Sequence, residues 1–305
     1  MPSFRYVTLD VFTTERFGGN PLAVFPDASG IEAADMQRIA AEFNYSEITF
    51  VLPPEDPANT ARVRIFEPNH ELPFAGHPNV GTAFLLGQMG SLFGRRIGDS
   101  LRFEELGGIV TARLLRDGSK VTGARIQAPQ PLQVRAEIEP ETIAACASLA
   151  VGDIVTTHHR PVIATVGLPF ALAEVRSVEA LGRAQPDATS FRSADARHRQ
   201  PEISFSLMLY ARTGDAPTTL RTRMFALLGN IIEDPATGSA SAALGGYLTS
   251  LMPQPDTETR FVMNQGVEMG RPSVIEVRAT KARGEVHQVE VGGPCVPVMR
   301  GEIEL

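Results

Sequence analysis

Titratable side chains stand at three places where the sequence changes abruptly from polar to apolar. Glu47 directly precedes the apolar run 48–52, His77 precedes an apolar helical segment, and Glu233 and Asp234 precede a second one. Burial raises the pKa of a carboxyl group toward neutral pH, where the group can both take up and release a proton. Glu47 is therefore the candidate acid/base, and His77 and the two later carboxylates are its candidate partners.

Each of these residues also has a purely structural interpretation. Glu47 could be a solvated residue at a strand edge, because most glutamates are exposed. Glu233 could cap the helix that follows it, and His77 could be a structural histidine whose hydrogen bonds are satisfied. The burial of Glu47 and its distance from His77 separate these interpretations.

Two segments, 78–89 and 235–251, are apolar or small on every side. A helix without a polar face has to be buried all round, so each segment predicts the central helix of a domain. Glycine and other small residues stand at both helix starts, at 76–81 and 236–240. Unpaired backbone N–H groups and about half a positive charge make a helix N-terminus a binding site for anions such as a substrate carboxylate. The alternative is that the small residues only permit close helix packing.

The two halves of the sequence resemble each other. An Arg-x-Phe segment precedes each buried helix, at 64–66 and at 223–225, so that the arginines lie 159 residues apart, as do the phenylalanines. A weaker similarity relates the proline-containing turns and strands at 18–25 and 166–175. Each half is therefore expected to contain strands, a tight turn and a buried helix, and the two helix starts are expected to face each other across a cleft.

Short strands dominate the remaining sequence. Alternating apolar, β-branched or aromatic side chains predict strands at 5–12, 22–25, 47–52, 61–66, 109–115, 121–127, 203–210, 220–225, 260–265, 273–279 and 286–291. Asp117 and Gly118 predict a hairpin turn between two of them. This mixture of strands and helices predicts an α+β protein.

Two amphipathic helices are also expected. One spans about 31–43 and has Ser29 and Glu32 at the spacing of a capping box. The other begins near Pro140, a residue favoured in the first turn, and carries Cys146.

Length and charge narrow the class of protein. A chain of 305 residues, 43% apolar and 21% charged, is large enough for about two domains. It has no stretch close to the roughly 20 apolar residues of a membrane span, and its start lacks the features of a secretory signal. The formal charge is −7 and the basic residues are scattered, whereas nucleic acid attracts clustered Lys and Arg. We expect a cytoplasmic protein that binds neither nucleic acid nor membranes.

Several cofactor and nucleophile motifs are missing. Cys146 and Cys295 lie far apart in apolar segments and are expected to be small buried side chains. The six histidines form no pair at metal-ligand spacing, and CxxC, GxSxG, P-loop and GxGxxG motifs are absent. The sequence therefore indicates neither a metal site nor a nucleotide site.

Six segments, in order along nearly the whole chain, resemble the phenazine-biosynthesis PhzF-like isomerases, which have the diaminopimelate-epimerase-like fold. They are DVFTxxxFxGNPLAVF (10–25), NYSEITFV (44–51), RIFxPxxELPFAGHPxxGTA (64–83), EDPATGSAxAALGxYL (233–248), QGxxMGRPS (265–273) and VGGxCVPVxxGEI (291–303). ELPFAGHP and EDPATGSA are the most specific parts. One departure is Leu227, where the family often has a proline after Phe-Ala.

The resemblance implies an α+β fold of two pseudo-symmetric domains, each a curled, mostly antiparallel or mixed β-sheet around a central buried helix. The expected domains are 1–127, with the last residues of the chain as a candidate addition, and 132–305. The active site is expected in the cleft between them, and the protein is expected to be a homodimer.

The resemblance also implies the chemistry. Glu47 matches the family's acid/base, which removes a proton from one carbon of a conjugated, dihydro-hydroxyanthranilate-like carboxylate and returns it to another. Epimerase and racemase relatives use two cysteines, but Ala75 and Pro235 stand at those places here, so a two-thiol mechanism is excluded. No metal, nucleotide or other cofactor is implied, since the conjugated substrate delocalises its own charge.

Positions that match the family's other site residues come from both halves of the chain: Asn20, Gly76, His77, Asp234, Gly238 and Ser239. The resemblance implies that His77 and Asp234 assist the proton transfer together with Glu47. The two glycines supply backbone donors, Ser239 helps to hold the substrate, and Asn20 lines the pocket.

Two alternatives remain. One is a small-molecule-binding or interaction protein that has the fold without turnover. The other is an epimerase that uses Glu47 without thiols and needs a second acid/base on the opposite face of its substrate. The joint presence of Glu47, His77, Asp234 and Ser239 favours the isomerase, because a binding protein has no need of a desolvated carboxylate beside an anion site.

Overall fold

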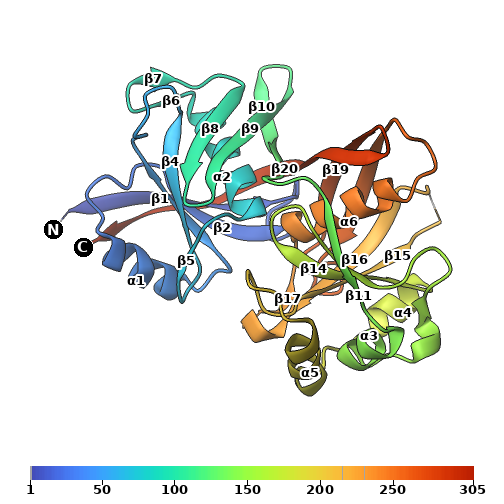
Figure 1. Ribbon diagram of the computed structural model, residues 1–305. Coiled ribbons are helices and arrows are strands. Elements are labelled where there is room, and N and C mark those ends of the chain that lie inside the picture. The colour runs from blue at the N-terminus through green and yellow to red at the C-terminus, as the bar shows by residue number, and fades with distance from the viewer. Residues whose placement is uncertain (1, 215, 230) are drawn as a thin grey trace. The chain divides into compact units, whose positions relative to one another are not determined.

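The computed structural model describes residues 2–214, 216–229 and 231–305, which form a mixed α+β fold with six α-helices (Figure 1). The chain divides into two compact units, Met1–Gln127 with Gly292–Leu305, and Ala128–Val291. The end of β20 (Glu285–Glu304) pairs antiparallel with β1 (Ser3–Val11), which brings the two chain ends together. Residues 292–305 therefore lie in the first unit and not with the rest of the segment 132–305.

Strands make up most of the first unit. They are β1, β2 (Asn20–Phe25), β3 (Ile48–Leu52), β4 (Ala61–Phe66), β5 (Glu71–Leu72), β6 (Ser91–Leu92), β7 (Arg95–Arg96), β8 (Ser100–Glu105), β9 (Gly108–Asp117), β10 (Lys120–Gln127) and the end of β20. The helices are α1 (Ala33–Phe43) and α2 (Gly76–Met89). Strand β3 runs parallel to β2 and β8 runs parallel to β4, whereas β3–β4 and β8–β9 are antiparallel. The predicted hairpin turn is confirmed between β9 and β10, where Gly118 has φ +57°.

Helix α2 is buried on every side from Gly76 to Leu86. It packs against β1, β2, β3, β9 and β10, and its Thr82 hydroxyl lies 2.9 Å from that of Thr49 on β3. At Gly81 an added Cβ would lie only 2.5 Å from Leu22 Cδ2. The sequence has glycine here because the helix axis runs too close to the strands for any side chain.

The second unit has a similar order of elements. Its strands are β11 (Gln133–Glu137), β12 (Ile154–Val155), β13 (Val162–Thr165), β14 (Pro169–Val175), β15 (Leu207–Arg212), β16 (Thr219–Ala226), β17 (Ile231–Asp234), β18 (Thr257–Gln265), β19 (Ser273–Ala282) and the start of β20. Its helices are α3 (Pro140–Ala147), α4 (Val178–Arg183), α5 (Ala188–His198) and α6 (Gly238–Ser250). Strand β15 runs parallel to β14 and β18 to β16, whereas β15–β16 and β18–β19 are antiparallel.

Helix α6 is buried almost completely, from Ala240 to Thr249, and packs against β13, β14, β18 and β19. At Gly245 an added Cβ would lie 2.6 Å from Val277 Cγ1, so this helix also approaches its strands at a glycine. Within the described ranges, neither this helix nor any other is long and apolar enough to cross a membrane.

The two Arg-x-Phe segments make the same contacts in their own units. Arg64 on β4 binds Glu71 through two hydrogen bonds of 2.7 and 2.6 Å, and Arg223 on β16 binds Glu233 through two of 2.8 Å. Each guanidinium also lies over the phenylalanine two residues further on, at 5.0 and 4.9 Å. The capping interpretation of Glu233 is therefore wrong, because its carboxylate is occupied by Arg223.

Several local predictions need correction. Helix α1 begins at Ala33 with no side-chain cap, and the Ser29 amide instead donates to Asp27 Oδ1 at 3.0 Å, so the capping box is wrong. Helices α4 and α5 were not predicted, because α5 buries only Phe191 and Ala194 and its apolar pattern is weak. The predicted strand at 203–210 begins only at residue 207.

Replacing Gly81 with alanine should destabilise the first unit. The new methyl group would overlap Leu22, and such overpacking costs about 1–3 kcal/mol, which outweighs the gain of about 1 kcal/mol in helix propensity. Gly182→Ala in α4 is the matched control, since nothing lies within 4 Å of its added Cβ, and it should preserve or raise stability. Urea unfolding of both variants measures the difference, and equal midpoints would contradict the close packing of α2.

Candidate active site

Glu47 lies between the end of α1 and the start of β3. Asn44 closes the helix in the left-handed conformation, with φ 51°, and all five residues of β3 are buried. The Glu47 side chain is 15% exposed, and burial raises its pKa to about 7, although the neighbouring Ser46 lowers it somewhat. The structure thus gives Glu47 the desolvated environment expected of an acid/base.

His77 is the second residue of α2 and faces Glu47. Its Nε2 lies 3.6 Å from Glu47 Oε2, and its side chain is only 5% exposed. This distance is longer than a normal hydrogen bond, and a small shift would bring the two groups into bonding distance. The interpretation of Glu47 as an exposed residue far from His77 is wrong.

Asn20 and Ser46 adjoin this pair. Asn20 is the first residue of β2 and is 1% exposed, and the Ser46 hydroxyl donates to its Oδ1 at 3.3 Å. The same hydroxyl lies beside the Glu47 carboxyl. Because a hydroxyl has one proton, Ser46 can donate to only one of these acceptors at a time. Asn20 is therefore connected to Glu47 through Ser46, a residue that the sequence analysis quoted within NYSEITFV without a role.

Glu67 is a second carboxyl near Glu47. Burial and the charge of Glu47 raise the pKa of Glu67, whereas His70, whose Nδ1 lies 3.5 Å from Glu67 Oε2, lowers it. Two neighbouring carboxylates disfavour each other's charged form. Sequence analysis missed Glu67, since it follows a strand in a polar segment with nothing to mark it as buried.

In the second unit, Asp234 ends β17 and is 6% exposed. The Thr237 hydroxyl donates to its Oδ2, and Gln265 Nε2 donates to its backbone carbonyl at 2.8 Å. The Thr237 amide in turn donates to Gln265 Oε1 at 3.2 Å. Gln265 is fully buried, so it holds the turn that precedes α6 in one conformation.

The rest of the segment 265–273 supports the same turn. The Ser273 hydroxyl donates to the carbonyl of Pro235 at 2.8 Å, and at Gly266, which has φ +70°, an added Cβ would lie 2.6 Å from the same oxygen. The motif QGxxMGRPS is therefore a support for the start of α6. Its place next to EDPATGSA could not be read from spacing, because the two motifs lie on different strands.

Both buried helices begin without a side-chain cap. Ala75 precedes α2 and Thr237 precedes α6, and neither makes a side-chain cap hydrogen bond to the helix. Gly76 and Gly238 are the first residues of these helices, and Ser239, next to Gly238, is partly exposed. Helix α6 thus begins three residues later than predicted, because Asp234 to Thr237 form the turn held by Gln265.

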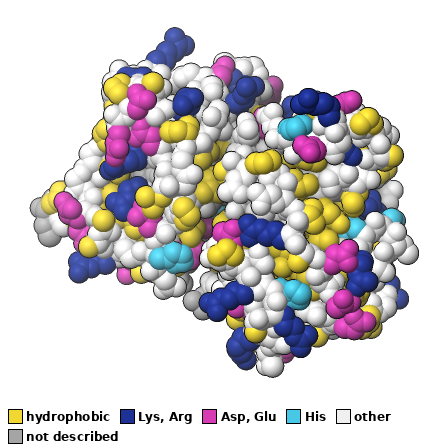
Figure 2. Space-filling view, viewed as in Figure 1, with side chains coloured by type: hydrophobic (Ala, Val, Ile, Leu, Met, Phe, Trp, Pro, Cys, Tyr) yellow, Lys and Arg dark blue, Asp and Glu magenta, His cyan; other side chains and the backbone are white. Residues whose placement is uncertain are grey.

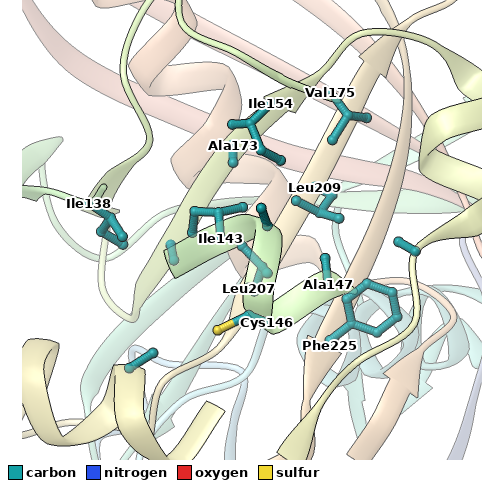
Figure 3. Close-up of a cluster of buried hydrophobic side chains, with 14 of the residues drawn as sticks. Ile138, Ile143, Cys146, Ala147, Ile154, Ala173, Val175, Leu207, Leu209 and Phe225 are labelled. Atoms are coloured by element: carbon teal, nitrogen blue, oxygen red, sulfur yellow. The ribbon is translucent and has the colours of Figure 1, made fainter. Parts of the chain in front are cut away.

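Both thiols are buried. Cys146 of α3 is fully buried among side chains such as Ile143 and Leu207 (Figure 3), and burial followed by the nearby Asp187 raises its pKa to about 12. Burial also raises the pKa of Cys295 to about 12. At such values the reactive thiolate is almost absent near neutral pH.

Charged side chains of both signs are mixed on the face shown in Figure 2. In the second unit, for example, Arg160 pairs with Glu137 and Glu139 at 3.1 and 2.6 Å, and Arg176 pairs with Asp153 at 2.6 Å. Residues 2–214, 216–229 and 231–305 contain no group of three or more His, Cys, Asp or Glu side chains placed to hold a metal ion.

The structure gathers the predicted site residues into two groups. Glu47, His77, Gly76 and Asn20 lie at neighbouring positions of the first unit, around the start of α2. Asp234, Gly238 and Ser239 lie around the start of α6 in the second unit.

The chain is similar to known proteins over nearly its whole length. Residues 9–301 match the model of the family described as phenazine biosynthesis-like protein. The chain is 37% identical to an uncharacterized isomerase of Mesorhizobium japonicum and 36% identical to the trans-2,3-dihydro-3-hydroxyanthranilate isomerase of Pseudomonas chlororaphis, with 99% of each chain covered in both cases. A PhzF-family protein of Bacillus anthracis has the same fold, with a TM-score of 0.87 over the whole of both chains at 24% identity. The chain therefore belongs to the phenazine biosynthesis-like family and is an isomerase.

Proposed function

We propose that this isomerase needs no cofactor and shifts a proton on a small carboxylated substrate, similar to dihydro-hydroxyanthranilate, with Glu47 as the acid/base. One observation carries the proposal: the buried Glu47 carboxyl has a pKa of about 7 and faces His77 at an uncapped helix start. A relative that is 36% identical over 99% of both chains is named for an isomerisation of this class.

Glu47 alone can carry the proton from one carbon of the substrate to the other. The Glu47 carboxylate takes a proton from one carbon of the substrate, the C–H bond breaks, and its electron pair enters the conjugated system. The resulting carboxylic acid returns the proton to another carbon, where an electron pair of that system forms the new C–H bond. A pKa near 7 allows the group both to take up and to release the proton near neutral pH. Such an acid/base typically accelerates a reaction 10²–10⁴-fold.

Groups around Glu47 stabilise the charge that develops during the transfer. His77 lies 3.6 Å from the carboxyl and is proposed to assist the proton transfer. The backbone N–H groups at the start of α2 point along the helix axis and are proposed to bind an anionic oxygen of the substrate, with Gly76 allowing close approach. Asn20 is proposed to line this pocket, connected to the carboxyl by Ser46.

The start of α6 is proposed to contribute to the same substrate. Asp234 would assist the proton transfer, while Gly238 and Ser239 would hold the substrate, in the roles that the family resemblance gives them. Gln265 keeps this turn rigid, which favours binding without a large ordering cost.

The similar order of strand pairings supports a further structural proposal. The parallel and antiparallel pairs of β14, β15, β16 and β18 follow the same order as those of β2, β3, β4 and β8. We propose that the two units are pseudo-symmetric domains, each built around one buried helix, and that each contributes its helix start to the substrate site.

A binding protein without turnover is the second candidate. It would use the same helix starts but would have no need for a carboxyl that is poised near neutral pH. Proton exchange with solvent separates the two functions, because a binding protein would not incorporate solvent deuterium into its ligand. The same measurement also detects an epimerase that uses Glu47 without thiols.

Glu47→Gln should abolish the proton transfer while leaving binding largely intact. The amide keeps the shape and hydrogen bonding of the side chain but cannot accept a proton, so turnover of trans-2,3-dihydro-3-hydroxyanthranilate, or deuterium exchange into it, should fall by about 10²-fold or more. Glu67→Gln is the matched control, because it removes the neighbouring carboxyl, and it should keep most of the turnover. Wild-type exchange in Glu47→Gln would end the proposal.

The pH dependence should report the same carboxyl. Glu47 must be ionised to take the first proton, so kcat/KM should rise with pH through a midpoint near 7. Initial rates between pH 5 and 8 measure this midpoint. A midpoint near the ordinary glutamate value, about 4.3, would show that the active base is not buried.

The family resemblance leads us to propose a homodimer. Sedimentation at micromolar concentration should therefore give twice the monomer mass of 32.9 kDa. A single species of monomer mass over this concentration range would contradict the proposal.

A further inference from the structure

Glu105 is a second buried carboxyl that the proposed reaction does not use. It ends β8, and the turn that follows it packs on residues 73–75, the segment from which α2 starts. The Gly107 amide donates to the carbonyl of Pro73 at 2.8 Å, and an added Cβ at Gly107 would lie only 2.7 Å from that oxygen. The end of β8 therefore supports the turn that leads to His77.

The buried oxygen atoms of Glu105 and Asn79 lack a hydrogen-bond donor among the described residues. Both carboxyl oxygens of Glu105 are shielded from solvent, and neither accepts a hydrogen bond from the described residues. Asn79 lies beside this carboxyl and is fully buried; its Nδ2 donates to the carbonyl of Ala75 at 2.9 Å, while its Oδ1 is without a donor in the described part of the chain. An ionised carboxyl offers only acceptors and leaves Asn79 Oδ1 unsatisfied, whereas a protonated one supplies the missing O–H.

The groups that face Glu105 do not supply a positive charge. The segment 73–75 carries no titratable side chain, and residues 108–110 on β9 carry none either. Arg62 on β4 acts on the adjacent Glu104 instead. Burial raises the pKa of Glu105 to about 8. Asn79 acts in the opposite direction, since its amide N–H lies close enough to favour the ionised carboxyl, but among the described residues no hydrogen bond of normal geometry reaches either carboxyl oxygen.

We propose that Glu105 is a positioning residue that stays protonated at neutral pH and donates its O–H to Asn79 Oδ1. Asn79 in turn holds the Ala75 carbonyl, so the bond fixes the turn that presents His77 to Glu47. The inference rests on the proposed function for its effect on activity. The protonation of Glu105 is independent of that function.

Ionisation of Glu105 then loosens the catalytic turn. Above a pH of about 8 the O–H is lost. In the proposed arrangement a buried carboxylate then lies beside the amide oxygen of Asn79. Two acceptors without a proton between them repel each other, so residues 73–77 lose their support. The pH–rate profile should therefore have two limbs, one that rises as Glu47 ionises and one that falls as Glu105 ionises.

Unfolding measurements test the protonation without any substrate. A carboxyl whose pKa is raised in the folded state loses its stabilising contribution as pH rises from the unfolded pKa to the folded pKa. The unfolding constant of the wild type, divided by that of Glu105→Gln, should rise by up to tenfold per pH unit between about 4.5 and 8, and should be constant outside this range.

Glu104→Gln is the matched control on the same strand. Burial opposes ionisation of Glu104, but hydrogen bonds from the Asn59 side chain and from the amides of Glu55 and Asp56 lower its pKa. Its contribution is therefore lost only at pH values below the ordinary glutamate pKa. The unfolding constant of the wild type, divided by that of Glu104→Gln, should therefore stay constant between pH 5 and 8.

Activity measurements test the positioning role. Glu105→Gln keeps an N–H donor for Asn79 but does not titrate, so it should retain the turnover and lose the falling limb above pH 8. Glu105→Met removes the donor and should lower kcat about tenfold or more at every pH, with a smaller effect on KM. The substrate is trans-2,3-dihydro-3-hydroxyanthranilate, and deuterium exchange replaces turnover where product is not detected.

Each arm has an outcome that overturns the inference. The same pH dependence of unfolding in the wild type and Glu105→Gln would show that the carboxyl is ionised at neutral pH. A falling limb that persists in Glu105→Gln would separate Glu105 from catalysis. Should Glu105→Met fail to fold, the comparison of Glu105→Gln with the wild type decides the question alone. Failure of the proposed function is recognised separately, because Glu47→Gln would then exchange solvent deuterium into the substrate at the wild-type rate.

Discussion

The cost of removing one carboxylate from water underlies the whole arrangement around Glu47. Each pKa unit corresponds to about 1.4 kcal/mol of differential interaction, so a shift from 4.5 to about 7 means that the folded chain holds the ionised form at a cost of about 3 kcal/mol. The stability of a domain is only about 5–15 kcal/mol. A strand that is buried throughout and a helix buried on all sides have to supply that energy, and both lie next to Glu47.

The buried helices explain why so much of the sequence consists of small residues. A helix that packs against several strands must approach them closely, and Gly81 and Gly245 stand where an added Cβ would overlap a neighbouring side chain. The same helices leave their first N–H groups without side-chain caps, because the preceding residues, Ala75 and Thr237, do not provide them. The packing requirement and the proposed anion-binding role therefore come from one feature, a helix that starts inside the protein.

The sequence predicted those elements whose patterns are strong. Apolar or small residues on every side predicted the buried helices α2 and α6. Polar-to-apolar transitions indicated Glu47 and His77 as candidate site residues, and their side chains lie 3.6 Å apart. Prediction failed where a residue's role depends on a partner distant in sequence. Glu233 looked like a cap because its neighbour is a helix, whereas the β16–β17 pairing brings Arg223 to it. Gln265 and Glu105 could not be recognised either, since their importance comes from the turns against which they pack.

Activity and stability make opposite demands on this arrangement. The folded-state pKa of Glu47 is raised, so its contribution to stability is fully present below pH 4.5 and is lost as pH rises through about 7. In the proposed mechanism, that is the pH range in which the carboxylate base forms. A chain that lowered this cost by exposing Glu47 would return its pKa to the ordinary value, and the carboxylate would become a weaker base. The paired Arg64–Glu71 and Arg223–Glu233 contacts hold β4 to β5 and β16 to β17, beside the two helix starts. The fold thus keeps a desolvated carboxyl at Glu47 while salt bridges hold the neighbouring strands together.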